Sequence, residues 1–215
     1  MTTIVRLSPT TMQQGIDALV AVDADFARVY EQYGTPPEWF RPQGFSTLLY
    51  IILEQQVSLQ SAKAAYDRLL AAVAEITDTG LTPEIFLTFE DEQLKQFGFS
   101  RQKTRYGRIL AEKIRDGNID LAALDTMPDE EVLTALTSLT GIGPWTANIY
   151  LLMVLKRVDV WPIGDVALAT AYKEIKGLDE RPTQPELAEI AEAWRPWRAI
   201  AARLLWNHYL HKRAK

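Results

Sequence analysis

The stretch LTGIGPWTA, residues 139–147, is the part of the sequence best suited to bind an anion. Glycine at 141 and 143 permits positive φ angles and has no side chain to hold a ligand away from the backbone. Pro144 suits the first turn of a helix, where its missing N–H costs nothing. The N–H groups and positive dipole end of that helix would then face a phosphate. An ordinary tight turn between two helices is the alternative that the glycines alone leave open.

Basic residues gather in two stretches, although the formal net charge is −5. One runs from 194 to 215 and contains no acid, and the other, from 99 to 115, has Glu112 as its sole acid. A local positive surface can attract a polyanion in spite of the net charge, so both stretches are candidate nucleic-acid surfaces. Solvated helix faces are the alternative. The basic residues of the stretch from 99 to 115 are Arg101, Lys103, Arg105, Arg108, Lys113 and Arg115.

Helical periodicity with start and stop signals covers nearly all of the chain, and it predicts an all-α fold of about ten helices. The order of these helices permits two lobes. Thr183 and Glu186 fit a capping box ahead of a long final helix. Residues 3–7 and 158–161 resemble short strands. Residues expected at helix starts are Ser46, Ser58, Thr82, Ser100, Thr126 and Asp165.

Composition excludes several classes of protein and site. With 47% hydrophobic residues in 215, the chain can bury a sizeable core. The absence of cysteine excludes disulfides and thiolate metal sites, and with His208 and His211 as its two histidines the sequence predicts no metal site. The apolar run at 149–155 is too short to cross a membrane. Because no signal-peptide pattern opens the sequence, we expect a cytoplasmic protein, or a nuclear one in a eukaryote.

Several motifs in one order resemble a known family. LTGIGPWTAN at 139–148 is followed by PIGD at 162–165, which resembles the helix-hairpin-helix–Gly/Pro/Asp superfamily of DNA glycosylases. Three further segments, ILEQQVS at 52–58, GFSRQKTRYGRILAEKI at 98–114 and PWRAIAARLLW at 196–206, resemble its 3-methyladenine DNA glycosylase II branch. The likeness runs from about Pro36 to Trp206.

The resemblance implies a helix-hairpin-helix glycosylase fold, with two helical lobes around a cleft. It also implies that residues 1–215 form one compact unit, with the helix-hairpin-helix motif at 139–150. Such a protein is a monofunctional glycosylase of base excision repair, which removes alkylated purines such as 3-methyladenine and 7-methylguanine. Some members carry an additional N-terminal β domain, and we expect this chain to be a compact version without it.

The resemblance places the catalytic carboxylate at Asp165. Breaking an N-glycosidic bond gives the sugar oxocarbenium character, which a nearby carboxylate stabilises. A simple helix cap at Asp165 is the alternative, and the two roles are compatible. Trp145 stands where the endonuclease III-like branch has a nucleophilic lysine, so no Schiff base can form at this position and no lyase activity is expected.

The resemblance also implies how DNA and the extruded base are bound. Trp145 and Trp206 match aromatic residues of the base pocket, which attract a cationic purine through cation–π contact. Gln56 matches the residue that fills the vacated place in the duplex. Ile149 replaces a tyrosine found in some members, which leaves the breadth of substrates open. Because neutral bases need protonation to leave and the sequence offers no candidate general acid, we expect activity mainly on cationic lesions. DNA-backbone contacts are expected from Gly141, Ile142, Gly143, Thr146, Arg101 and Lys103.

The expected partner is therefore double-stranded DNA, bound by a monomer that uses no cofactor and does not associate with membranes. In several family hairpins a monovalent cation bridges backbone carbonyls and phosphate, and the sequence neither requires nor excludes such an ion. Three alternatives stay open at this point. They are a non-catalytic helix-hairpin-helix DNA-binding module, a glycosylase for another damaged base, and an all-α protein-interaction scaffold.

Overall fold

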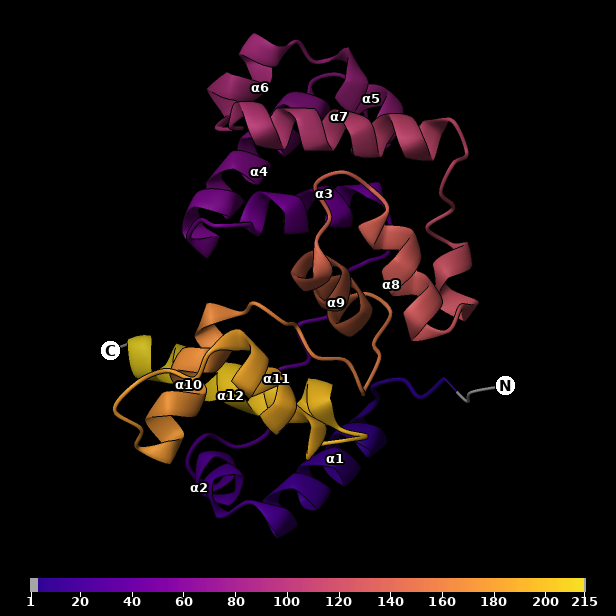
Figure 1. The fold of residues 1–215 in the computed structure, drawn as a ribbon. Helices are drawn as coiled ribbons and strands as arrows, with labels where there is room; N and C mark the ends of the chain where they lie inside the picture. The colour runs from indigo at the N-terminus through magenta and orange to yellow at the C-terminus, as the bar shows by residue number, and fades with distance from the viewer. Residues whose placement is uncertain (1–3, 215) are drawn as a thin grey trace. The chain divides into compact units, whose positions relative to one another are not determined.

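A computed structural model describes residues 4–214, and the chain folds into two compact units (Figure 1). The first unit combines Met1–Phe40 with Leu151–Lys215, and the second is Arg41–Tyr150. Over the described residues the chain forms twelve α-helices and one short 3-10 helix, which confirms the predicted all-α class. No helix in this part of the chain is both long and apolar enough to cross a lipid bilayer.

In the first unit, helix α12 forms the centre. Every residue from Ala199 to His208 is buried, and a helix buried on all sides must be surrounded by other elements. Helices α1, α2 and α10 pack against it (Figure 1). The helices of this unit are α1 (Pro9–Val22), α2 (Ala24–Tyr33), α10 (Val166–Lys176), α11 (Gln184–Glu192) and α12 (Arg198–Arg213).

Helix α3 has the corresponding place in the second unit, since eight of its residues are buried, among them Leu48–Leu49 and Ile51–Glu54. Helices α4 and α7 pack against α3, and α5 and α6 pack against α7. Helix α9 (Pro144–Met153) begins in this unit and ends in the first. The other elements are α3 (Phe45–Glu54), α4 (Leu59–Ala74), α5 (Pro83–Thr88), α6 (Asp91–Phe97), α7 (Arg101–Arg115), η1 (Ala123–Thr126) and α8 (Asp129–Thr137).

Most of the predicted helix starts are confirmed. The side chains of Ser58, Thr82, Ser100, Asp165 and Thr183 each accept a hydrogen bond from a backbone N–H in the first turn of the helix that follows. Each such cap stabilises the fold by about 1 kcal/mol. These starts were predictable because a cap involves only residues close together in sequence.

Two predicted caps are wrong. Helix α3 begins at Phe45 after Gly44, and the hydroxyl of Ser46 instead hydrogen-bonds that of Tyr66 at 2.5 Å. The hydroxyl of Thr126 donates to the carbonyl of Ala123 within the preceding 3-10 turn. In both cases the hydroxyl group forms a different hydrogen bond, which the sequence pattern alone does not reveal.

Two larger predictions are also wrong. The long final helix is two helices, α11 and α12, because Pro196 lacks an N–H and disfavours helical backbone in the residue before it. The capping box of Thr183 and Glu186 starts α11 as predicted. The strands expected at 3–7 and 158–161 do not form over the described residues, and residue 3 lies outside them. Instead, Arg6 and Arg157 form an isolated antiparallel β-bridge.

Candidate functional site

Asp165 and Trp206, far apart in the sequence, meet in the first unit. Asp165 is the N-cap of α10, where its Oδ1 accepts a hydrogen bond from the backbone N–H of Leu168 at 2.9 Å. The same oxygen accepts from the indole Nε1–H of Trp206, on α12, at 3.4 Å. The packing of α10 against α12 brings the two side chains together. The structure therefore places an acid that caps a helix directly beside an aromatic ring.

Apolar side chains next to Asp165 are exposed. Ile163 is 46% and Val166 58% exposed, while Asp165 itself is half-buried. Exposed apolar groups beside a polar centre are typical of surfaces that a ligand covers. A ligand over this carboxylate would remove both side chains from water and lower the local dielectric, which strengthens the field of the charge.

The two glycines of the 139–147 stretch have different structural roles. Gly141 has φ +94°, and a Cβ built on it would lie 2.2 Å from Cγ of Tyr106 on α7. Gly143 does not have a positive φ, and a Cβ on it would have no atom within 4 Å. Gly141 is therefore required by the packing of the second unit. Gly143 leaves the backbone before α9 open to a ligand.

Gln55 ties the loop after α3 to this turn. Its amide Nε2 donates to the carbonyl of Gly141 at 2.9 Å and to the hydroxyl of Thr146 at 2.8 Å. Thr146 is 1% and Ile142 3% exposed, so both side chains lie inside the second unit. Gln55 was missed by the sequence reasoning. The motif EQQVS contains two adjacent glutamines, and no pattern within it shows which one faces inward.

Gln56 lies at the exposed tip between α3 and α4. It has φ +56°, a left-handed conformation that costs a non-glycine residue roughly 1–2 kcal/mol. Val57 and Leu59 beside it are 44% and 61% exposed. A strained polar residue flanked by exposed apolar side chains is well placed to insert between the bases of a duplex. That Gln56 fills the place of the extruded base stays a prediction.

The basic stretches are less available than the sequence indicates. The ammonium of Lys103 donates to the carbonyl of Leu53 at 2.6 Å, at the C-terminal end of α3, and burial lowers the pKa of this lysine. Arg101 and Arg105 are exposed on α7. Their contacts with DNA, and that of Lys103, stay predictions.

Much of the positive charge near the C-terminus is compensated within the first unit. Arg195 and Arg198 form ion pairs with Asp159 and Glu192, and Arg213 pairs with Glu174. These pairs leave less of the charge near the C-terminus for a polyanion than the count of basic residues suggests.

Trp145 is half-buried in the first turn of α9, in the second unit, and Ile149 is 2% exposed on the same helix. The expected pocket role of Trp145 stays a prediction. The hairpin carbonyls of Leu139 and Gly141 accept from the N–H of Ile142 and the amide of Gln55. Because each oxygen retains a second lone pair, these carbonyls are chemically suited to a monovalent cation.

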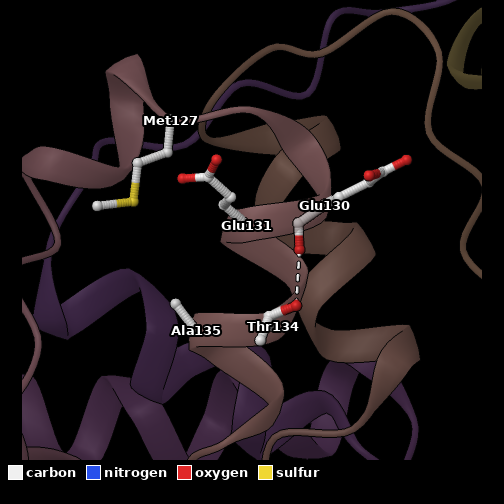
Figure 2. A pocket seen from close by; sticks show the side chains of 5 residues that line it. All are labelled: Met127, Glu130, Glu131, Thr134 and Ala135. Atoms are coloured by element: carbon white, nitrogen blue, oxygen red, sulfur yellow. Dashed lines mark hydrogen bonds between the residues drawn. The ribbon is translucent and has the colours of Figure 1, made fainter.

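A pocket on α8 is unsuited to an anion. Figure 2 shows it lined by Met127, Glu130, Glu131, Thr134 and Ala135, with the hydroxyl of Thr134 donating to the carbonyl of Glu130 at 2.9 Å. Two carboxylates without a basic residue among the lining side chains repel phosphate. The pocket therefore does not compete with the turn at Gly143 for a phosphate.

We expect the bond from Gln55 to Thr146 to contribute about 0.5–1.5 kcal/mol to the stability of the second unit. The measurement is a double-mutant cycle with Gln55→Met and Thr146→Val, followed by urea unfolding. Since the pair is in contact, the two effects should not add. Gln56→Met, at the exposed neighbouring position, is the control and should change stability by less than about 0.5 kcal/mol. Additive effects of Gln55→Met and Thr146→Val would contradict the coupling.

Comparison with known proteins identifies the family of this chain. A family model described as HhH-GPD superfamily base excision DNA repair protein matches residues 49–196. A DNA-3-methyladenine glycosylase of Bacillus subtilis is 27% identical over 173 residues, which cover 77% of this chain and 57% of that protein. The chain thus spans less than two thirds of the length of this relative.

Two solved structures are similar over nearly their whole length. A 3-methyladenine DNA glycosylase of Schizosaccharomyces pombe, solved in complex with abasic DNA, matches with a TM-score of 0.82 and 26% identity, over 90% of this chain and 95% of that one. A DNA-3-methyladenine glycosidase of Bacillus halodurans matches with a TM-score of 0.75 and 29% identity, over 99% and 95%. The predicted helix-hairpin-helix glycosylase fold is confirmed by these matches.

Proposed function

Because this chain belongs to the HhH-GPD superfamily of base excision DNA repair proteins, we propose that it is a DNA glycosylase for alkylated purines in double-stranded DNA. The substrates proposed are 3-methyladenine and 7-methylguanine, in keeping with the names of the similar proteins. The observation that carries the proposal is the hydrogen bond from the indole of Trp206 to the carboxylate of Asp165. This bond places a carboxylate that could stabilise positive charge on the sugar beside an aromatic ring that could contact the base.

In the proposed reaction the N-glycosidic bond breaks and its electron pair leaves with the purine. The purine is already cationic, so it departs neutral and needs no protonation. The positive charge that develops at the sugar carbon is stabilised by the carboxylate of Asp165. A water molecule then bonds to that carbon, and its proton passes to Asp165 or to solvent. The products are a free base and an abasic site.

DNA would be held through its backbone by the turn at Gly143 and the first turn of α9. The first N–H groups of a helix lack intrahelical acceptors, and α9 begins at Pro144 directly after the open Gly143. Backbone groups of Gly141, Ile142 and Thr146 are also proposed to contact the DNA backbone, and a cation held by the hairpin carbonyls would add positive charge toward a phosphate. Arg101 and Lys103 on α7 would supply further charge, and Gln56 would fill the place of the extruded base.

The base would be recognised by aromatic side chains. Electron-rich indoles attract a cationic purine by cation–π contact, worth about 0.5–2 kcal/mol. Trp206 is the indole that the geometry supports, since it is bonded to Asp165. Trp145 is proposed as a second such residue on the resemblance. We also propose a monomer that acts in the cytoplasm, or in the nucleus of a eukaryotic cell.

The experiment that tests this function uses duplex DNA with a single 7-methylguanine, followed by heat or alkali treatment. We expect cleavage at the lesion well above that of a protein-free sample carried through the same treatment, because an abasic site is alkali-labile. A duplex with hypoxanthine, a neutral base that needs protonation to leave, should be cleaved far more slowly. No release of 7-methylguanine at saturating protein, or equally fast release of hypoxanthine, would contradict the proposal.

The proposed enzyme leaves the DNA strand intact. Because an indole at position 145 cannot form a Schiff base, borohydride added during the reaction should trap no protein–DNA adduct. Denaturing electrophoresis without alkali should show the full-length strand, and the same sample after alkali should show the cleaved one. A trapped covalent band together with spontaneous strand cleavage would contradict this prediction.

A non-catalytic DNA-binding module is the second candidate function. Such a module needs the turn at Gly143 to bind the DNA backbone. It needs neither a catalytic carboxylate nor an aromatic ring that receives a base. The bond between Trp206 and Asp165, with exposed apolar side chains on both sides of that acid, favours the enzyme.

A further inference from the structure

We propose that Trp39 is a further substrate-contacting residue, which forms with Trp206 an aromatic corner that selects cationic over neutral purines. The inference deepens the proposed function and rests on it. It concerns residues of the first unit alone, because Trp39, Trp206 and Asp165 all belong to Met1–Phe40 and Leu151–Lys215.

The first observation is the arrangement of the rings. The centroids of Trp39 and Trp206 lie 6.2 Å apart, and their planes are inclined by 83°. Trp206 is 8% exposed and Trp39 is half-buried, so a planar base would stack on the exposed part of Trp39 and present its edge to Trp206. Trp206 also donates to Asp165, so a base in this corner would lie beside the acid that the mechanism requires. Trp39 is half-buried, which leaves part of its ring available.

The second observation is the backbone of Trp39. Its φ is +48°, in the left-handed region that costs a residue with a side chain roughly 1–2 kcal/mol. A tryptophan that only covered a core would gain nothing from this conformation. Unfavourable backbone angles persist when their surroundings impose them, and they are concentrated at binding and catalytic sites.

Arg203 supplies that constraint. Its guanidinium is fully buried and donates to the carbonyl of Glu38, directly before Trp39, from Nη2 at 3.1 Å and from Nε at 3.3 Å. Further donor bonds reach the carbonyls of Leu152 and Ala199. Burial lowers the pKa of Arg203 to about 10, so the group stays charged at neutral pH.

Arg203 and Trp206 are three residues apart on α12, a spacing that puts side chains on the same side of a helix. Helix α12 thus carries both Trp206 and Arg203, the cation that holds the backbone next to Trp39. The aromatic corner is therefore preorganised by the fold, which reduces the entropy lost when a base binds.

The chemistry favours a cationic base. Two indoles present π faces and edges without an acceptor for a neutral purine's amino group, apart from the carboxylate of Asp165. A methylated purine cation gains both the attraction of the rings and that of the carboxylate. A neutral purine gains stacking and, at most, one hydrogen bond from its amino group to Asp165.

The test compares binding of two small probes, the 3,9-dimethyladeninium cation and neutral 9-methyladenine, by titration calorimetry. The parent protein should prefer the cation by about tenfold. Trp39→Phe retains a π face and should keep this preference within about threefold. Trp39→Leu retains an apolar side chain without a π face and should show a preference at least about threefold lower than Trp39→Phe, since Trp206 and Asp165 still supply the rest. Both variants carry the same backbone strain, so a difference between them reports on the ring.

Trp194→Phe is the matched control. Trp194 is 4% exposed and packs against Phe26 and Trp161 in the same unit. The control should lower the melting temperature and leave the preference for the cation unchanged. Equal preference in Trp39→Leu and the parent would overturn the inference, as would an equal loss in the Trp194→Phe control.

Excision of 7-methylguanine, measured on the same proteins, separates this inference from the proposed function. An inactive parent that binds the cation through Trp39 would refute the glycosylase and support the aromatic corner. An active parent whose Trp39→Leu variant excises at an unchanged single-turnover rate would refute the aromatic corner and support the glycosylase. If both ideas hold, Trp39→Leu lowers that rate by about tenfold, with little change in affinity for undamaged duplex.

Discussion

Asp165→Asn is expected to lower the single-turnover rate of alkylpurine release by roughly 100- to 1,000-fold. The substitution removes one negative charge and little else. Asparagine keeps an Oδ1 that can accept from the N–H of Leu168 and from the indole of Trp206. Since asparagine and aspartate are nearly equivalent as N-caps, helix α10 should keep its start.

The measurement pairs the release rate at saturating protein with thermal unfolding. Asp165→Ala is the control, because it removes both the charge and the cap and should cost about 1 kcal/mol of stability. Asparagine and alanine should then share the catalytic defect and differ in stability. If Asp165→Asn keeps its release rate within tenfold of that of the parent, Asp165 acts only as a helix cap and not in catalysis.

Gly141→Ala should destabilise the protein by about 2–4 kcal/mol. The added methyl group would lie 2.2 Å from Cγ of Tyr106, and the backbone has φ +94°. Neither problem can be relieved by a local shift, because the carbonyl of Gly141 is held by Gln55 and the ring belongs to α7. Urea unfolding, with the slope checked for two-state behaviour, measures the effect.

Gly143→Ala is the matched substitution in the same turn. Its methyl group meets no atom within 4 Å, and the backbone has no positive φ, so stability should change by less than about 0.5 kcal/mol. If the backbone here binds phosphate, the methyl group stands in the way, and affinity for duplex DNA at fixed salt should fall by about tenfold. Unchanged affinity would remove Gly143 from the proposed interface. Equal stability losses in the two variants would contradict the division of roles.

The all-α class and most helix starts could be predicted from the sequence, because both depend on local interactions. A cap such as Ser100 or Thr183 bonds a backbone group three residues away, and helical periodicity shows within a few turns. The turn that contains Gly141 and Gly143 was predictable for the same reason, from glycine and proline. The motif order pointed to the family, which the match over residues 49–196 establishes.

The arrangement of side chains within each unit was decided only by the tertiary structure. The contact of Asp165 with Trp206, the inward turn of Gln55 and the corner at Trp39 each join residues distant in sequence. The pairing of Arg195 and Arg198 with Asp159 also cancelled charge that the local sequence presents as basic. Such contacts depend on how helices pack, and packing follows from the summed fit of many side chains rather than from any short motif.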